Sequence, residues 1–259
     1  MIGLELHVIV DDYQRDKEYL SEHGLSLFFR NNSKSVLFDA GQSDIFIYNA
    51  KKKGLDISNI DFVVFSHGHY DHTGGINSIP LTEKTRIYLH PDALLPKYSG
   101  NRYIGMPQTD RKKYFILREN YEKLADNIIY LGYIPRKKNK PLGYTVFNGK
   151  MIRDYLRDDT ALVIKMDSYI IILAGCSHSG IHNIVAYADR FYPGISKTLI
   201  GGFHMHNYTE EEIIGVVERL SSYNVEYVYP GHCTGAKATK YLLSNFEGEK
   251  IYSGMTIDL

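Results

Sequence analysis

Three histidines and an aspartate fall within six consecutive positions, in the run His67-Gly68-His69-Tyr70-Asp71-His72. The run directly follows the apolar segment 62–65, which is typical of a buried strand. Such a cluster is costly to desolvate, and its imidazoles repel one another when they are protonated. A divalent metal ion removes both problems, because neutral imidazole and carboxylate are among its ordinary ligands. These residues therefore predict a metal-binding protein, and we expect an enzyme.

Three further histidines lie in glycine-rich turns, each between an expected strand and an expected helix. His178 lies in the turn 175–180, His204 follows Gly201-Gly202-Phe203, and His232 follows Pro230-Gly231. Layered α/β folds gather their ligands at turns of this kind, at the carboxyl ends of strands. One such histidine would be a structural hydrogen-bonding residue, but the repeated arrangement favours metal binding.

The hydrophobic pattern predicts the strands and helices that position these turns. Strands are expected over 4–10, 25–29, 36–39, 60–65, 87–90, 160–166, 169–174, 197–201, 225–229 and 250–257. Helices are expected over 44–53, near 113–124, over 180–191 and 236–246, and after a capping box at Thr209–Glu212. Each half of the chain has strands followed by strand–helix units. This order predicts an α+β sandwich of two mixed sheets with helices on both outer faces.

Length and composition fit one soluble domain. The 259 residues are 44% hydrophobic, which is enough for a sizeable core. The segment 91–127 is irregular and carries too little apolar sequence for a core of its own. We therefore expect a single domain over 1–259, with an irregular insertion at about 91–127.

Charge and cysteine usage restrict the partners and the compartment. The formal net charge is zero, so nothing indicates nucleic acid or an anionic membrane, and the basic segment 135–141 is expected to be a solvated connector. The chain has two cysteines, Cys176 and Cys233, and no leader-like or membrane-spanning stretch. We expect a cytoplasmic protein whose partner is a small-molecule substrate, with a homo-oligomer left open. Cys233 is expected to be a small buried residue.

The run 67–72 after an apolar strand resembles the signature of the metallo-β-lactamase superfamily. The segment Phe38–Gly41 resembles that family's early Asp-x-Gly turn, and Pro230-Gly231-His232 resembles its closing histidine turn. The turns around His178, His204 and His232 are similar to the branch typified by dihydropterin-(ribofuranosyl)aminobenzene-phosphate synthase. The resemblance covers nearly the whole chain and implies an αββα sandwich with one or two metals.

The resemblance also implies the ligands. Those of the first metal are His67, His69 and a third histidine, and those of the second are Asp71, His72 and His232. The sequence departs from the family at two places. The family usually has its third ligand where this chain has residues 157–160, and a bridging aspartate where this chain has residues 175–178. His178 is expected to complete the first site. Asp159 and Cys176 are the two candidates for the bridging ligand.

The implied activity is that of a metal-dependent hydrolase, or of a transferase of the synthase type, on a small phosphorylated or pyrophosphorylated metabolite. One or two divalent metals would polarise the substrate and activate water; zinc is expected, with iron, manganese and magnesium left open. Asp71 would orient the water or protonate a leaving group, and His204 would contact the substrate, protonate a leaving group or support a ligand. The candidate phosphate contacts are Arg102, Arg153 and Arg157.

Two alternatives stay open. The first is an enzyme that hydrolyses carboxylic esters, thioesters or lactones, and the second is a metal-bound metabolite sensor with little turnover. A closed structural zinc site is disfavoured, because such sites usually have four ligands rich in cysteine. A nuclease is disfavoured by the absence of a basic tract for phosphate backbones.

Overall fold

The computed structural model describes residues 3–31, 33–136 and 140–259. The chain divides into two compact units. Unit 1 comprises Met1–Arg118, Pro141–Asp158 and Tyr252–Leu259, and unit 2 comprises Glu119–Lys140 and Asp159–Ile251. The expected single-domain organisation with an insertion at about 91–127 stays a prediction. Part of the basic connector at 135–141 lies outside the described residues, as does residue 32 in the expected hairpin turn.

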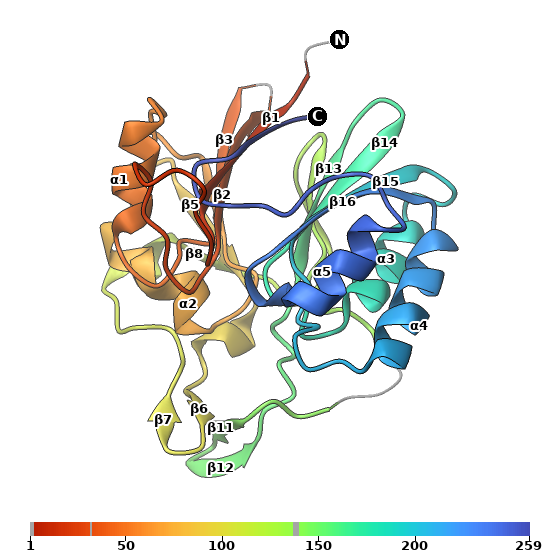
Figure 1. Cartoon of the computed structure of the whole chain (residues 1–259). Coiled ribbons are helices and arrows are strands. Elements are labelled where there is room, and N and C mark those ends of the chain that lie inside the picture. The colour runs from red at the N-terminus through yellow and green to blue at the C-terminus, as the bar shows by residue number, and fades with distance from the viewer. Residues whose placement is uncertain (1–2, 32, 137–139) are drawn as a thin grey trace. The chain divides into compact units, whose positions relative to one another are not determined.

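Unit 1 is built on a seven-stranded mixed sheet in the order β17-β1-β2-β3-β4-β5-β8 (Figure 1). Its strands are β1 (Glu5–Val10), β2 (Ser26–Asn31), β3 (Lys34–Phe38), β4 (Phe62–Val64), β5 (Arg86–Leu89), β8 (Phe115–Leu117) and β17 (Thr256–Asp258). Pairing is antiparallel from β17 to β3 and parallel from β3 to β8. The helices are α1 (Ile45–Lys52) and α2 (Tyr70–Thr73), with 3-10 turns η1 (Gly74–Ser78), η2 (Pro91–Leu94) and η3 (Arg111–Tyr114). Phe46 and Ala50 of α1 are buried against Val63 and Ile87 of the sheet.

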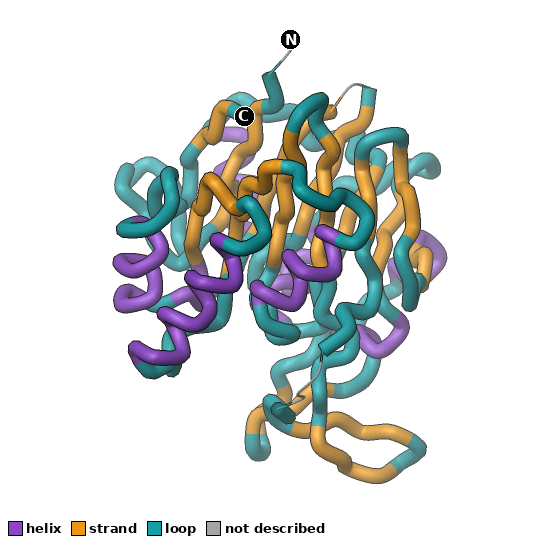
Figure 2. The backbone as a smooth tube through the Cα atoms, turned by 90° about the vertical axis from the view of Figure 1, so that its right-hand side faces the viewer, coloured by secondary structure: helices purple, strands orange, loops and turns teal. Residues whose placement is uncertain are grey.

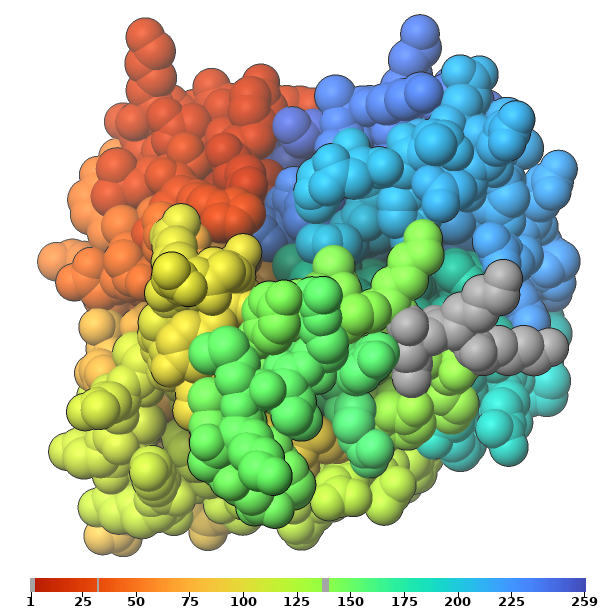
Figure 3. Space-filling view, turned by 90° about the horizontal axis from the view of Figure 1, so that it is seen from below, coloured from red at the N-terminus to blue at the C-terminus, as the bar shows by residue number. Residues whose placement is uncertain are grey.

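A second, four-stranded antiparallel sheet belongs to unit 1. It joins β6 (Lys97–Ser99) and β7 (Arg102–Tyr103) to β11 (Tyr144–Phe147) and β12 (Lys150–Arg153), in the order β12-β11-β6-β7. We call these four strands the inserted sheet. It lies at the bottom of Figures 1 and 2, and β11 and β12 stand at the front of Figure 3 in green. The inserted sheet therefore pairs two segments that are far apart in the sequence.

Unit 2 is built on a six-stranded mixed sheet in the order β16-β15-β14-β13-β10-β9. Its strands are β9 (Glu122–Ala125), β10 (Ile128–Tyr130), β13 (Ala161–Lys165), β14 (Tyr169–Ala174), β15 (Ser196–Gly202) and β16 (Val225–Gly231). The helices are α3 (Ile181–Asp189), α4 (Glu210–Ser221) and α5 (Ala236–Leu243), and the 3-10 turn η4 covers His232–Thr234. The three helices share one apolar core with the sheet. The predicted capping box of Thr209 and Glu212 is confirmed at the start of α4.

The pattern-based elements are confirmed with two exceptions. The strand expected over 250–257 is confirmed only at its end, because β17 covers Thr256–Asp258. The expected helix near 113–124 is wrong: this stretch contains the end of η3, then β8, then the start of β9. The apolar run Phe115-Ile116-Leu117 pairs with β5 at the edge of the sheet. Periodicity alone does not separate so short an apolar run from a helix turn. None of the helices in the described ranges is both long and apolar enough to cross a membrane.

Candidate functional site

The predicted metal ligands divide between the two units. His67, His69, Asp71 and His72 belong to unit 1, whereas His178 and His232 belong to unit 2. The candidate bridging residues Asp159 and Cys176 also belong to unit 2, as does His204. Each unit therefore contributes its own cluster of donor side chains.

Two of the unit 1 donors, His67 and His69, lie on the turn between β4 and α2, and the other two, Asp71 and His72, lie in α2 itself. His67 and His72 are fully buried, and His69 and Asp71 are nearly so. Gly68 allows this packing, because a Cβ atom there would lie 2.2 Å from the carbonyl oxygen of Ala93 in η2. The glycine between the first two histidines is thus required by the close approach of η2.

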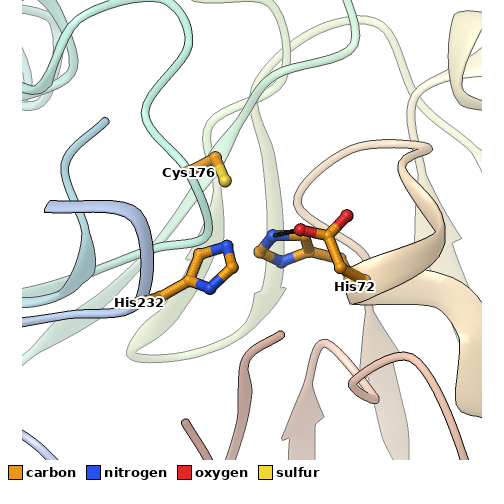
Figure 4. Close-up of side chains that lie close together, drawn as sticks. His72, Cys176 and His232 are labelled. Carbon is orange, nitrogen blue, oxygen red and sulfur yellow. Dashed lines mark ion pairs between the residues drawn. The ribbon is translucent and has the colours of Figure 1, made fainter. Parts of the chain in front are cut away.

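The imidazoles of this turn are close together. Nε2 of His67 lies 3.0 Å from Nδ1 of His69, and Nε2 of His72 lies 3.5 Å from Oδ2 of Asp71, the ion pair dashed in Figure 4. Burial lowers the pKa of His69 to about 4, with a smaller contribution from the charge of Lys97, although Asp71 opposes this shift. At neutral pH His69 therefore carries the neutral imidazole that metal binding requires.

Asp39 supports two of these histidines from the loop after β3. Its Oδ2 atom lies 2.7 Å from Nδ1 of His72. Its carboxylate also accepts hydrogen bonds from the backbone and the hydroxyl of Ser66, whose hydroxyl lies 2.9 Å from Nδ1 of His67. A carboxylate on one ring nitrogen orients the ring and leaves the other nitrogen for a metal. Asp39 is the aspartate of the Asp-x-Gly turn that the sequence had singled out.

Sequence reasoning missed His23. Its Nε2 atom lies 3.4 Å from Oδ2 of Asp71, and its Nδ1 atom lies 2.9 Å from Oδ2 of Asp12. The neighbouring Gly24 packs so closely that a Cβ atom would lie 2.4 Å from the carbonyl oxygen of Asp71. His23 stands in a loop outside any motif, and no local signal could have placed it beside Asp71.

In unit 2, Asp159 engages the turn that carries His178. One of its oxygens accepts the backbone N–H of His178 at 3.0 Å, and the other accepts the backbone N–H of Ser179 at 2.9 Å and the Ser179 hydroxyl. Burial raises the pKa of Asp159, although the hydrogen bonds from Ser179, the charge of Arg136 and the hydrogen bond from His178 oppose it. Both oxygens of this candidate bridging ligand thus hold the turn after β14.

Cys176, the other candidate, lies among the unit 2 donors. Its sulfur is within 4.8 Å of a donor nitrogen of His178 and of one of His232, and also of donor atoms of His204 and Cys233. Figure 4 shows its thiol and the His232 imidazole. Cys176 is therefore the donor around which this cluster is arranged.

His204 extends the cluster as one of a row of imidazoles. Its ring centroid lies 4.4 Å from that of His178 and 4.9 Å from that of His206. Within the described ranges, the buried Nδ1 atom of His204 has no hydrogen-bond partner. His204 and His232 both have positive φ, at 48° and 45°, which is uncommon for residues other than glycine. Such strain tends to occur at functional sites.

Cys233 is half-buried, rather than the small buried residue expected. Burial raises the pKa of its thiol. The hydrogen bond with Cys176 and the influence of His232 and His204 outweigh burial and lower the pKa well below its ordinary value. This thiol therefore ionises more readily than a free cysteine.

Of the three candidate phosphate-binding arginines, Arg102 contacts Tyr70 within the run His67–His72. From β7 its guanidinium lies 5.4 Å from the ring centroid of Tyr70, and Nη2 lies 3.2 Å from the Tyr70 hydroxyl. Arg153 lies over the Tyr144 ring at 4.6 Å, and Nε of Arg157 lies 3.6 Å from a carboxylate oxygen of Asp92. Because Tyr70 stands between His69 and Asp71, Arg102 is tied to the segment that carries the donors.

Residues 22–232 match the family model of the metallo-beta-lactamase superfamily. The chain belongs to the metallo-β-lactamase superfamily. Its structure is similar to the crystal structure of Tm1679, a metal-dependent hydrolase of the β-lactamase superfamily, with a TM-score of 0.89, 33% identity and coverage of 99% of both chains. The expected metallo-β-lactamase fold is thus confirmed.

Two relatives come from Methanocaldococcus jannaschii. An uncharacterised protein is 33% identical over 92% of this chain and 94% of its own length. The 7,8-dihydropterin-6-methyl-4-(β-D-ribofuranosyl)-aminobenzene-5'-phosphate synthase is 28% identical over 98% of this chain and 96% of its own. The expected similarity of this metallo-β-lactamase-fold protein to the synthase branch is confirmed.

Proposed function

We propose that this protein is a metal-dependent hydrolase of a small phosphorylated or pyrophosphorylated metabolite. The proposed ligands are His67, His69, Asp71 and His72 of unit 1 and Cys176, His178 and His232 of unit 2. These nitrogen, oxygen and sulfur donors fit zinc. His69 is neutral, as a metal requires, and the carboxylate of Asp39 orients the ring of His72. Cys176 is preferred to Asp159, because the oxygens of Asp159 bind the turn.

The residues of the chain have separate tasks in this proposal. When bound, a divalent metal supplies positive charge that polarises a phosphoryl oxygen and makes a nearby water more acidic. Asp71, at Oδ2, accepts a proton from the attacking water, and His23 orients that carboxylate. His204 donates a proton to the leaving group.

The position of Arg102 is the observation that favours a phosphorylated substrate over a neutral one. A guanidinium presents a planar set of donors that suits phosphate oxygens, and stacking on Tyr70 limits its motion. An enzyme acting on neutral esters, thioesters or lactones has no need of this cation beside its donor motif. The contact between Arg102 and Tyr70 therefore favours an anionic phosphate group.

A second candidate function is favoured by the near full-length similarity to the synthase. In this version the nitrogen of an aromatic amine attacks the pterin methylene carbon that carries the pyrophosphate. The C–N bond forms, the C–O bond breaks, the amine loses a proton, and pyrophosphate departs. The same residues would serve, because both reactions require binding of a phosphorylated group. Release of pyrophosphate only when an aromatic amine is present would distinguish the transferase from the hydrolase.

Steady-state kinetics of Arg102→Ala test the substrate class. Metal-loaded protein is assayed with aryl phosphates, phosphodiesters, pyrophosphates, thioesters and lactones. We expect turnover of phosphorus esters and a rise in KM of about tenfold in the variant, because a hydrogen bond to a charged group is lost. Arg153→Ala is the matched control, since Arg153 is likewise an arginine of the inserted sheet that stacks on a tyrosine, but that tyrosine, Tyr144, lies outside the run 67–72. Equal KM in wild type and Arg102→Ala, or turnover of thioesters or lactones alone, contradicts the proposal.

A further inference from the structure

Lys97, the first residue of β6, is a buried cation. Its side chain is 1% exposed, and its Nζ atom lies 3.0 Å from Oδ2 of Asp154 and 2.9 Å from Oδ1 of Asp158. Both carboxylates are buried as well. Stability alone is a weak reason to retain such a group, because desolvation offsets much of the attraction between buried charges.

Asp158 connects this ion pair to the turn His67-Gly68-His69, which we call the donor turn. Its second oxygen, Oδ2, accepts the backbone N–H of Gly68 at 2.7 Å. A short hydrogen bond to a carboxylate is among the stronger kinds in proteins. Gly68 lies between His67 and His69 and is packed closely on Ala93. The peptide between the two histidines is therefore held by the carboxylate of Asp158 and by η2.

The backbone of the inserted sheet provides a second connection. The carbonyl of Lys97 accepts the N–H of Ile104 at 2.8 Å, and the carbonyl of Ile104 accepts the N–H of Tyr70 at 3.0 Å. His69 also forms an isolated β-bridge with Gly105. The inserted sheet thus reaches the donor turn through Lys97 by both a side-chain and a backbone route.

We propose that Lys97 and Asp158 are positioning residues that hold the His67-Gly68-His69 turn in its metal-binding conformation and couple it to the inserted sheet. Asp158 fixes the Gly68 peptide, and Lys97 fixes Asp158 and compensates its charge. The inference rests on the proposed function in one respect, namely that His67 and His69 are metal ligands.

A second buried lysine provides a matched control. Lys197 of β15 has a fully buried side chain, and its Nζ atom lies 2.7 Å from Oδ1 of Asp189. It also donates a hydrogen bond to the carbonyl of Ile195. Neither partner belongs to a donor turn. Lys197→Met therefore removes a buried, paired ammonium without acting on the proposed ligands.

The test compares Lys97→Met, Asp158→Asn and Lys197→Met in the full chain. Zinc affinity is measured by competition with a chromophoric chelator, and the Gly68 amide is followed by NMR in metal-free, 15N-glycine-labelled protein. We expect the first two variants to bind zinc roughly 10- to 100-fold more weakly, as for other residues that support ligands. Their Gly68 amide proton should move upfield as the charged hydrogen bond is lost or loosened. Lys197→Met should be less stable, but its zinc affinity and its Gly68 amide shift should equal those of the wild type.

Wild-type zinc affinity and an unchanged Gly68 amide in Asp158→Asn would overturn the inference, as would equal loss of affinity in Lys197→Met. Asp158→Asn is nearly isosteric and carries the test if Lys97→Met does not fold. Wild-type protein that binds no zinc would instead contradict the proposed function. The Gly68 amide shift, measured without metal, would then still decide whether Asp158 and Lys97 position the turn.

Discussion

Asp39 shows how one buried carboxylate supports two proposed ligands. It contacts His72 directly and His67 through Ser66. Its φ of 57° lies in the left-handed region, which aspartate tolerates better than most residues. The conformation of the loop after β3 is therefore part of the proposed metal-binding arrangement in unit 1.

Asp39→Asn should weaken zinc binding roughly 10- to 100-fold, because the amide supports His72 less strongly than a carboxylate does. Chelator competition measures the effect. Asp61→Asn is the control, since Asp61 pairs with Lys34 and Ser35 rather than with a donor. Equal zinc affinity in Asp39→Asn and Asp61→Asn would show that Asp39 does not support the zinc ligands.

Cys176→Ser should abolish the thiolate-to-cobalt absorption of the Co(II)-substituted protein, because Cys176 is the proposed sulfur ligand. Cys233→Ser should retain this absorption, which makes it the matched control. The near-ultraviolet spectrum measures both. Full thiolate absorption in Cys176→Ser would assign the sulfur ligand to Cys233 and contradict the proposal.

Some of these residues could be predicted from the sequence and others could not. The spacing within 67–72 predicts metal binding from the sequence, because all four donor residues lie within six consecutive positions. The choice between Asp159 and Cys176 depends on which way each side chain points. Asp159 precedes β13, whereas Cys176 lies in the turn after β14, where Ser177 has a φ of 56°. His23 comes beside Asp71 only through tertiary folding. Residue spacing contains neither piece of information.

At the scale of elements, local patterns succeed where a segment is locally determined. The capping box and buried stripe of α4 follow from its own residues. The inserted sheet pairs β6 with β11 across a long stretch of sequence, so no local pattern predicts it. The error near 113–124 has the same origin, because β8 is a strand through its pairing with β5.

Because of the Lys97–Asp158 pair, the free energy of unfolding should depend on pH in the acid range. Burial raises the pKa of Asp158, but the charge and hydrogen bond of Lys97 and the hydrogen bond of Gly68 outweigh it, so the pKa lies below its ordinary 3.8. A lowered folded-state pKa adds stability above the unfolded-state pKa, and this stability is lost as the pH falls through the folded-state pKa. Asp158→Asn should therefore cost about 3 kcal/mol near neutral pH and progressively less below about pH 4. Urea denaturation of both proteins at several pH values measures this. A cost independent of pH would show that Asp158 is not ionised in the folded protein.

At the scale of the whole molecule, the predicted ligands are shared between two units, each with its own sheet and core. The family match spans 22–232 and so includes donors of both units. The formal net charge is zero, so we expect the proposed phosphorylated substrate to be attracted by local groups such as Arg102 rather than by the field of the whole protein.

Anomalous diffraction at the zinc absorption edge, from crystals of the full chain grown with zinc, tests the central claim most directly. We expect one or two strong peaks at coordination distance from His67 and His69 and from Cys176. Absence of any peak at His67 and His69 under these conditions would contradict the proposed metal site.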